Sequence, residues 1–270
     1  MIWTAVRRVA IVVGAVLGAA AHSAAQTAPP NPHDAQPERP SVATHAWTVA
    51  PGWIEIEGGM EFDRYPEHSH GETAPLTTKI GLTSRAQLEL QTPIVHANGL
   101  HTAPGDLLIG AKWRPLEHAP IVASFAMFPS VKLPTGSTSE DAGTGTTDIG
   151  IVLISSREFG DVSLDLNVGF VHRVGHADRA PHESSMWAMS FGGPLHGQLG
   201  WAAELYGFPA TSGPAGDRSV LATLLGPTMK VRGWLVVDTG VIIPIAGPQP
   251  RALYAGGAYN IGRVVPSRNP

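Results

Sequence analysis

The sequence predicts an all-β protein, a closed antiparallel transmembrane β-barrel of about twelve strands. Three observations lead to this fold class. Apolar and polar residues alternate with period two from residue 52 onward, and the connections between the alternating stretches are long and short in turn. Charged residues make up only 15% of the chain, whereas a water-soluble domain usually carries about 25%. A chain of 270 residues is long enough to close one barrel as a single domain.

The beginning of the chain has the pattern of a secretory signal peptide. Arg7 and Arg8 form a short basic region, residues 9–21 are apolar, and Ser23-Ala24-Ala25 offers the small residues of a cleavage site. The apolar run is shorter than the roughly 20 residues that a membrane-spanning helix needs. We therefore expect residues 1–25 to be removed when the protein is exported.

Residues 26–46 hold five prolines among Gln, Asn, Asp and Ala. Proline fixes φ and removes a backbone donor, so this stretch is predicted to be an extended, disordered Pro-rich linker. It is also a candidate plug for a narrow barrel. The barrel itself is expected over residues 47–263, and residues 264–270 are expected to be a short tail.

Strict alternation is clearest after Trp53. Apolar Ile54, Ile56 and Phe62 fall on one face, and acidic residues at 55, 57, 61 and 63 fall on the other. Such a stretch predicts a strand with one face toward lipid and the other toward the lumen. The same pattern predicts strands at about 52–64, 75–83, 86–95, 105–114, 120–134, 148–156, 161–172, 185–192, 198–208, 219–230, 234–243 and 252–262.

The connections between these strands alternate in length. Long connections lie near 65–74, 96–104, 135–147, 173–184, 209–218 and 244–251, and short ones at 84–85, 115–119, 157–160, 193–197 and 231–233. Outer-membrane barrels have short periplasmic turns and longer external loops on an even number of strands. This predicts that both ends of the barrel lie on the short-turn side. A soluble β-sandwich or lipocalin-like barrel is the competing fold, but it need not alternate loop lengths.

Composition argues against several classes of function. There are 18 basic and 22 acidic residues, so no basic face for nucleic acid is expected. Cysteine is absent, which removes disulfides and thiolate metal sites. The Gly143-Thr144-Gly145 stretch lacks the lysine and the strand-to-helix context of a phosphate-binding loop. We expect no cofactor and no enzymatic activity.

Several short motifs point to one family. They are Gly105-Asp106-Leu107-Leu108-Ile109-Gly110-Ala111-Lys112-Trp113-Arg114, Leu133-Pro134-Thr135-Gly136, Gly81-Leu82-Thr83-Ser84-Arg85 followed by Leu88-Glu89-Leu90, and Leu253-Tyr254-Ala255-Gly256. Together they resemble a proteobacterial family labelled transporter, or MetA-pathway of phenol degradation, over about residues 47–262. The resemblance implies an outer-membrane channel for aromatic compounds, although the motifs themselves are structural.

The chain departs from many outer-membrane barrels at its end. Their last strand often carries a terminal aromatic that the barrel-assembly machinery reads, and here residues 263–270 follow the last predicted strand. The barrel-assembly machinery, outer-membrane lipid and a small-molecule solute are the partners expected of such a barrel.

The polar strand faces supply the candidates for the lumen lining. They are Glu55, Glu57, Glu61, Lys79, Glu89, Lys112, Arg114, Lys132, Asp165 and Glu204. These side chains either neutralise one another in a packed interior or form opposed acidic and basic arcs that select a small solute. About eight strands leave a filled interior and 16–18 leave a water-filled pore. A barrel of intermediate size is therefore expected to hold a narrow channel.

The expected outer rim carries candidate residues for two further functions. His68, His70, His172 and His176 are candidate metal ligands, because imidazole binds Zn²⁺ and Cu²⁺, but their spacing matches no compact metal motif. His172 and Ser185 are a candidate pair for a lipid hydrolase, with no third, orienting group apparent.

The expected function is a passive channel in the outer membrane of a Gram-negative cell, for small solutes of aromatic or hydrophobic character. A barrel whose His-rich rim captures metal ions is the alternative, and a barrel that hydrolyses lipid is a weaker one.

Overall fold

The computed structural model describes residues 31–66, 69–175, 179–213 and 215–264. The strands are β1 (Trp53–Arg64), β2 (His70–Thr83), β3 (Ala86–Ala97), β4 (Ala103–Pro104), β5 (Leu107–Ala119), β6 (Ala123–Leu133), β7 (Thr147–Phe159), β8 (Val162–Val174), β9 (Glu183–His196), β10 (Leu199–Phe208), β11 (Val220–Arg232), β12 (Leu235–Ala246) and β13 (Arg251–Arg263). Within the described ranges, no helix is long and apolar enough to cross a membrane.

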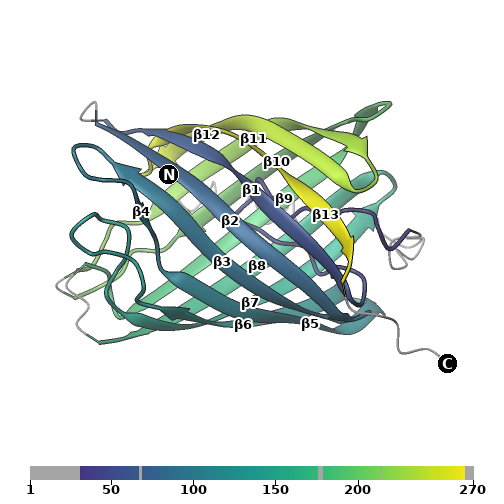
Figure 1. Ribbon diagram of the computed structural model, residues 1–270, viewed down its shortest axis with the longest axis horizontal. Helices are drawn as coiled ribbons and strands as arrows, with labels where there is room; N and C mark the ends of the chain where they lie inside the picture. The colour runs from purple at the N-terminus through teal and green to yellow at the C-terminus, as the bar shows by residue number, and fades with distance from the viewer. Residues whose placement is uncertain (1–30, 67–68, 176–178, 214, 265–270) are drawn as a thin grey trace, which may run out of the picture.

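The twelve long strands form one closed antiparallel barrel, which confirms the predicted fold class (Figure 1). Each long strand pairs with its neighbours in chain order, and β1 closes the ring by pairing with β13. The two-residue strand β4 is an addition that the alternation did not predict, and it pairs with the long-loop end of β3. Every one of the twelve predicted stretches corresponds to one long strand.

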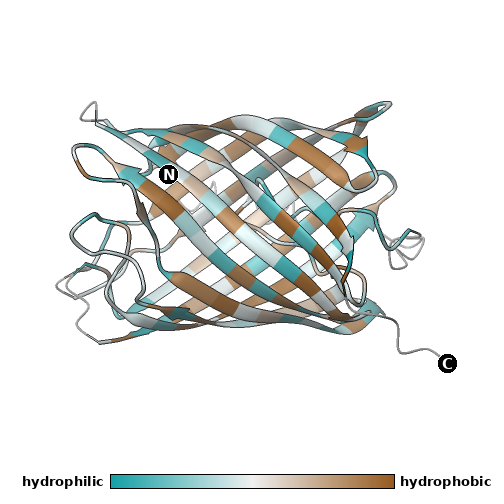
Figure 2. Ribbon diagram, in the orientation of Figure 1, coloured by the Kyte–Doolittle hydropathy of each residue, from teal (hydrophilic) through white to brown (hydrophobic). Residues whose placement is uncertain are grey.

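Hydropathy alternates along the strands, as Figure 2 shows. The outward residues of β7 and β8 include Ile149, Ile151, Val168 and Phe170, whose exposed fractions run from 37% to 54%. Such exposure of large apolar side chains around a closed barrel suits contact with lipid. Polar residues of the same strands, such as Asp148, Ser156 and Asn167, point inward and are buried.

The long loops and the short turns lie at opposite ends of the barrel (Figure 1). Trp53, the first residue of β1, pairs with Arg263, the last of β13, so the barrel begins and ends at the short-turn end, as predicted. β2 starts at His70, earlier than the predicted residue 75. The β1–β2 ladder has a gap between Leu76 and Thr73, and Pro75 occupies that gap, where it need not donate a hydrogen bond.

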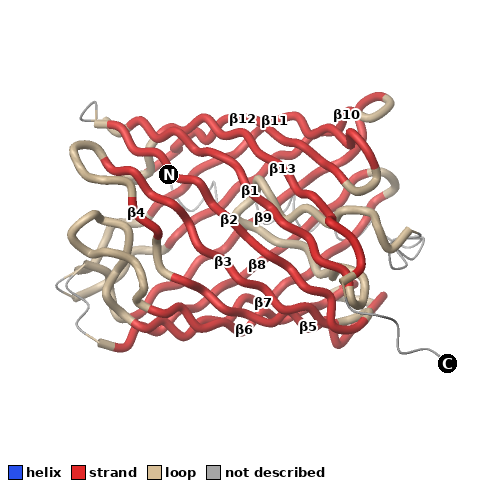
Figure 3. Tube along the Cα trace, viewed as in Figure 1, coloured by secondary structure: helices blue, strands red, loops and turns tan. Residues whose placement is uncertain are grey.

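Residues 31–52 are named the lumen segment here, because most of this stretch runs inside the barrel and only its ends lie at the short-turn end (Figure 3). This corrects the disordered linker expected over 26–46, because from residue 31 onward the chain is held by hydrogen bonds to inward-facing side chains. It also moves the start of the barrel from residue 47 to Trp53. Ala46 and Val49 are fully buried. The expected signal peptide and residues 265–270 of the expected tail lie outside the described residues.

Candidate functional site: the barrel lumen and its internal segment

The lumen segment enters and leaves at the short-turn end. On entering, the backbone N–H of Ala35 donates to the carbonyl of Gly233 in the β11–β12 turn at 2.8 Å. At its deepest it reaches Glu204 in the middle of β10. On returning, the N–H of Gly52 donates to the carbonyl of Gly81 near the end of β2, also at 2.8 Å. The segment is therefore a U-shaped loop that fills part of the barrel.

Lys79 of β2 organises the first contact between the wall and the lumen segment. Its Nζ lies 2.7 Å from Glu55 and also forms an ion pair with Glu57, and its side chain is fully buried. The two carboxylate oxygens of Glu57 accept the backbone N–H groups of Glu38 and Arg39, at 2.9 and 3.1 Å. A buried lysine is tolerated here because two carboxylates neutralise it.

Lys112 of β5 makes the second contact. Its Nζ forms an ion pair with Glu38 of the lumen segment and lies 3.7 Å from Glu89 of β3. It also donates to the hydroxyl of Thr44 at 2.8 Å and to the carbonyl of His45 at 3.0 Å. One fully buried ammonium group thus ties both limbs of the U to the same wall.

Arg114, two residues further along β5, holds the returning limb. Its guanidinium lies 4.6 Å from the ring centroid of Trp47, a cation–π distance. It also donates to the carbonyl of Ser84 at 2.9 Å and pairs with Glu117 at 2.9 Å. These contacts lie at the short-turn end, where the segment leaves the barrel.

The opposite wall holds the lumen segment through uncharged groups and two carboxylates, of which Asp238 of β12 lies 3.5 Å from the Arg39 guanidinium. Glu204 of β10 accepts the N–H groups of Val42 and Ala43, at 2.9 and 2.6 Å. The side-chain amide of Asn167 in β8 pairs with both backbone groups of Thr44, at 2.9 and 2.8 Å. The three backbone N–H groups of this deep stretch are therefore satisfied by wall side chains, without any secondary structure of its own.

The other three candidates, Asp165, Glu61 and Lys132, make no described hydrogen bond or ion pair to the lumen segment. Asp165 accepts a hydrogen bond from the hydroxyl of Ser156 at 2.5 Å. Glu61 lines a cavity toward the long loops. Lys132 pairs with Asp106 and, at 3.3 Å, with Asp148, near the long-loop end. All ten candidates thus lie within the barrel, but the structure gathers only Glu55, Glu57, Lys79, Glu89, Lys112, Arg114 and Glu204 around the lumen segment.

Asp106 anchors the loop between β6 and β7. Its carboxylate accepts the N–H of Gly136 at 2.9 Å and that of Thr144 at 3.1 Å, besides its ion pair with Lys132. Burial by itself raises the pKa of this carboxyl, but the bonds from Lys132, Gly136 and Thr144 outweigh burial and lower it below the ordinary value. The ionised form of Asp106 is therefore the one that the folded loop requires.

The two sides of the lumen differ in polarity. The wall of β1, β2, β3 and β5 carries the charged network described above. The wall from β9 to β13 instead presents a buried apolar cluster with Ala43 of the lumen segment, made of Ala188, Tyr206, Ala222, Leu224, Ile242, Ala252 and Tyr254. Of the two alternatives for the polar faces, the pairing of Lys79 and Lys112 with carboxylates on the β1–β5 wall fits mutual neutralisation in a packed interior rather than opposed acidic and basic arcs.

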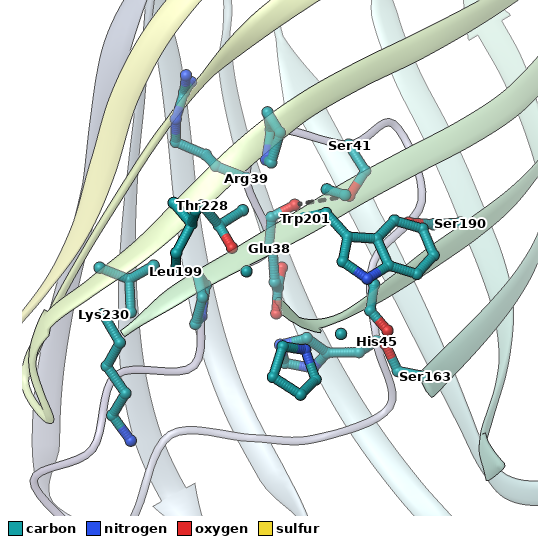
Figure 4. A pocket seen from close by; sticks show the side chains of 18 of the residues that line it. Glu38, Arg39, Ser41, His45, Ser163, Ser190, Leu199, Trp201, Thr228 and Lys230 are labelled. Carbon is teal, nitrogen blue, oxygen red and sulfur yellow. Dashed lines mark hydrogen bonds between the residues drawn. The ribbon is translucent and has the colours of Figure 1, made fainter. Parts of the chain in front are cut away.

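Two cavities lie on either side of the lumen segment. The short-turn chamber has a volume of about 690 Å³ and is lined by residues that include Ser163, Ser190, Trp201 and Thr228 (Figure 4). The long-loop chamber has a volume of about 770 Å³, and Phe128, Met186 and Phe208 are among its lining residues. Each is large enough for a small organic molecule.

The structure leaves the metal and hydrolase alternatives without a built site. His68 and His176 lie outside the described residues, and the part of the chain that is described holds no group of three or more His, Cys, Asp or Glu placed to bind a metal. His172 bonds through Nδ1 to Glu183 at 2.5 Å, an orienting partner that the sequence did not reveal. Ser185 lies opposite Phe170 in the β8–β9 ladder, and the described contacts include no hydrogen bond between it and His172.

The residues of the lumen segment that meet the wall, above all Glu38 and Arg39, were not among the predicted site residues. A signal for them was present in the strands. Inward positions of β1, β2 and β13 carry glycines, and a Cβ at Gly59 or Gly256 would lie within 2.7 Å of the Arg39 guanidinium. Inward glycines next to buried charges indicate that something occupies the lumen.

Comparisons with known proteins bear on the fold. No family model matches the chain, and no curated protein does. Among solved structures, the COG4313 outer membrane channel from Pseudomonas putida F1 superposes with a TM-score of 0.63 at 12% identity, over 80% of this chain and 98% of that one. OpdK from Pseudomonas aeruginosa with vanillate (TM-score 0.31, 8% identity, 78% and 98% coverage) and a mutant Rh. blastica porin (0.28, 9%, 77% and 100%) overlap too loosely to bear on it. The chain therefore has the fold of an outer-membrane channel protein, a closed twelve-stranded barrel.

Proposed function

We propose that this protein is a passive channel of the bacterial outer membrane for small solutes of aromatic or hydrophobic character. The observation that carries the proposal is a closed barrel with an apolar exterior and two internal chambers, one toward each end. Lipid-facing apolar strands place such a barrel in a membrane, and the chambers supply space for a solute. Signal-peptide export would bring the chain to the outer membrane.

The polarity of the lumen supports the class of solute. Lys79 and Lys112 are already paired with carboxylates, so they have little charge to offer a permeating ion. Side chains such as Phe128 and Met186 of the long-loop chamber favour a solute that buries an apolar surface. Hydroxyls such as Ser190 and Thr228 in the short-turn chamber suit one polar group on that solute.

Passive transport agrees with the sequence, which has no phosphate-binding loop to couple transport to a nucleotide. The resemblance to the phenol-degradation family points in the same direction, toward neutral aromatic solutes. That resemblance concerns the fold more than the site, so the support for the solute class comes from the side chains of the chambers.

Reconstitution tests the proposal. The purified protein would be placed in planar bilayers for conductance and in liposomes for uptake of benzyl alcohol, benzoate and benzylamine, which share a ring and differ in charge. We expect a small conductance and faster uptake of benzyl alcohol than of benzoate, relative to protein-free liposomes. Absence of both conductance and uptake would contradict the channel.

A further inference from the structure

The lumen segment lies between the two chambers and borders both of them. Both are lined by Glu38, Arg39, Pro40, Ser41 and Ala43, and among the described residues no strand residue lines both. Figure 4 shows Glu38, Arg39 and Ser41 of the segment in the pocket that Ser190 and Thr228 of the barrel wall also line. A solute that crosses the barrel must therefore pass the stretch 38–43.

The strands that line the chambers restrict where the crossing lies. The short-turn chamber is lined by β8 to β12 and by no described residue of β1 to β7. The long-loop chamber is lined by most strands, including β8, β9, β10 and β11. Only these four strands reach both chambers, so a path between the chambers runs along the β8–β11 wall.

Along β9 and β10, a short stretch lies between the two chambers. On β9, Ser190 lines the short-turn chamber and Met186 the long-loop chamber, with Ala188 between them. On β10, Glu204 and Tyr206 occupy the corresponding position. All three intervening residues are only 2% exposed, and Ala188 and Tyr206 form one packed cluster with Ala43 of the lumen segment.

Glu204 provides the polar tie across this stretch. Its two carboxylate oxygens hold the N–H groups of Val42 and Ala43 against the β10 wall. The rest of the U is fixed to the opposite wall by the Lys79 and Lys112 networks. Thr44, next to this stretch, stays bound to Asn167 and Lys112. Release of the Glu204 tie would therefore free residues 42–43 while the rest of the segment stays anchored.

We propose that solutes cross along the β8–β11 wall, and that Glu204 closes this path by holding residues 42–43 across it. The proposal rests on the channel function proposed above and names its constriction. A carboxylate that accepts two backbone N–H groups fixes a loop more firmly than packing alone, because hydrogen bonds to a charged acceptor are the stronger kind.

Conductance of three variants in planar bilayers tests the constriction. E204A removes both acceptors, and we expect a several-fold larger conductance than in the wild type. E204Q keeps one acceptor oxygen, so its conductance should fall between those of the wild type and E204A. E61A is the matched control, because it removes a lumen carboxylate that makes no described hydrogen bond to the segment. The heat-dependent gel shift of a folded barrel checks that each variant is assembled.

The outcomes separate this proposal from the channel function. A conducting wild type with an unchanged E204A overturns the constriction and leaves the channel standing, as does an E61A that opens as much as E204A. If the wild type is silent and E204A conducts, the constriction is supported, and solute uptake by liposomes then decides the channel function of the wild type. If neither protein conducts and neither supports uptake, both proposals are overturned.

A second measurement locates the path without altering Glu204. The chain has no cysteine, so single cysteines at Ser190, Met186 and Thr77 can be modified selectively with a bulky thiol reagent. We expect modification at Ser190 and at Met186, both on the β8–β11 wall, to reduce conductance strongly. Modification at Thr77 of β2, which lines the long-loop chamber away from that wall, should reduce it less. A stronger block at Thr77 than at Ser190 would place the path elsewhere and overturn the proposal.

Discussion

Lys112 of β5 and Glu38 of the lumen segment form an ion pair inside the barrel, with side-chain exposures of 0% and 11%. The pair joins residues that are 74 positions apart in the chain. Because neither charge reaches bulk water freely, each depends on the other, and the pair joins the wall to the segment.

Replacement of Lys112 by Gln should therefore loosen the lumen segment. The change leaves the carboxylates of Glu38 and Glu89 close together without their shared cation. Removal of one partner from a buried pair costs about 3–5 kcal/mol. We expect faster protease cleavage within residues 31–52 and a lower denaturant midpoint in detergent. The double variant K112Q/E38Q should recover part of the loss, and equal cleavage rates in K112Q and wild type would contradict the linkage.

Gly81 is predicted to be required by the returning limb. A Cβ at this position would lie 2.1 Å from the carbonyl oxygen of Ala50 and 2.4 Å from that of Val49, both backbone atoms. G81A should therefore displace residues 49–50 and speed cleavage there. G58A in β1 is the control, since its Cβ would meet the nearest atoms at 3.7 and 3.8 Å, an ordinary contact. Equal cleavage of the two variants would refute the requirement.

The loop anchored by Asp106 should be stable at neutral pH and release in acid. The folded-state pKa of Asp106 is lowered, so its contribution is present above the unfolded pKa and is lost as the pH falls through the folded value. The window lies below about pH 4, the usual range of an aspartate. Protease sensitivity of residues 134–146 from pH 7 to pH 3, read with an acid-stable protease, checks this. The loop of D106N should be sensitive to the protease at every pH. Release of the wild-type loop near pH 6 would contradict the role of Asp106 as its anchor.

The lipid-facing wall is tested by one charged substitution. Val168 lies mid-strand in β8 and is 43% exposed. V168K would place an ammonium group against lipid near the middle of the bilayer, at a cost of about 2–4 kcal/mol. We expect a lower folded yield in liposomes by the gel shift. I121K, in the β5–β6 turn where Ile121 is 86% exposed, should fold like the wild type, and an equal loss in both variants would argue against a membrane-facing β8.

The barrel could be predicted because its signal is local. In a strand with one side to lipid and one to the lumen, each residue reveals its face by its own polarity, so the alternation at Glu55 and Glu57 defined β1 correctly. Strand ends were harder, as at Pro75, where tertiary pairing extends β2 past a residue that usually ends a strand.

The lumen segment could not be predicted in the same way. Its backbone has no period, because its partners are side chains such as Asn167 and Gln87, spaced irregularly along other strands. Proline and polar residues then read as a linker, although Ala46 and Val49 are fully buried. Only the joint placement of buried charges and inward glycines reveals the segment, and that placement requires the barrel to be built first.

The position of the lumen segment before β1 constrains the order of assembly. β1 is the strand whose pairing with β13 completes the ring, and the same strand carries Glu57, which binds the segment. A ring that closed first would enclose Lys112 without Glu38, and the U would then have to enter through the short-turn end against packed side chains. The favoured order of assembly is therefore that the lumen segment binds the wall before β1 pairs with β13. The segment then acts as a template around which the last strands join.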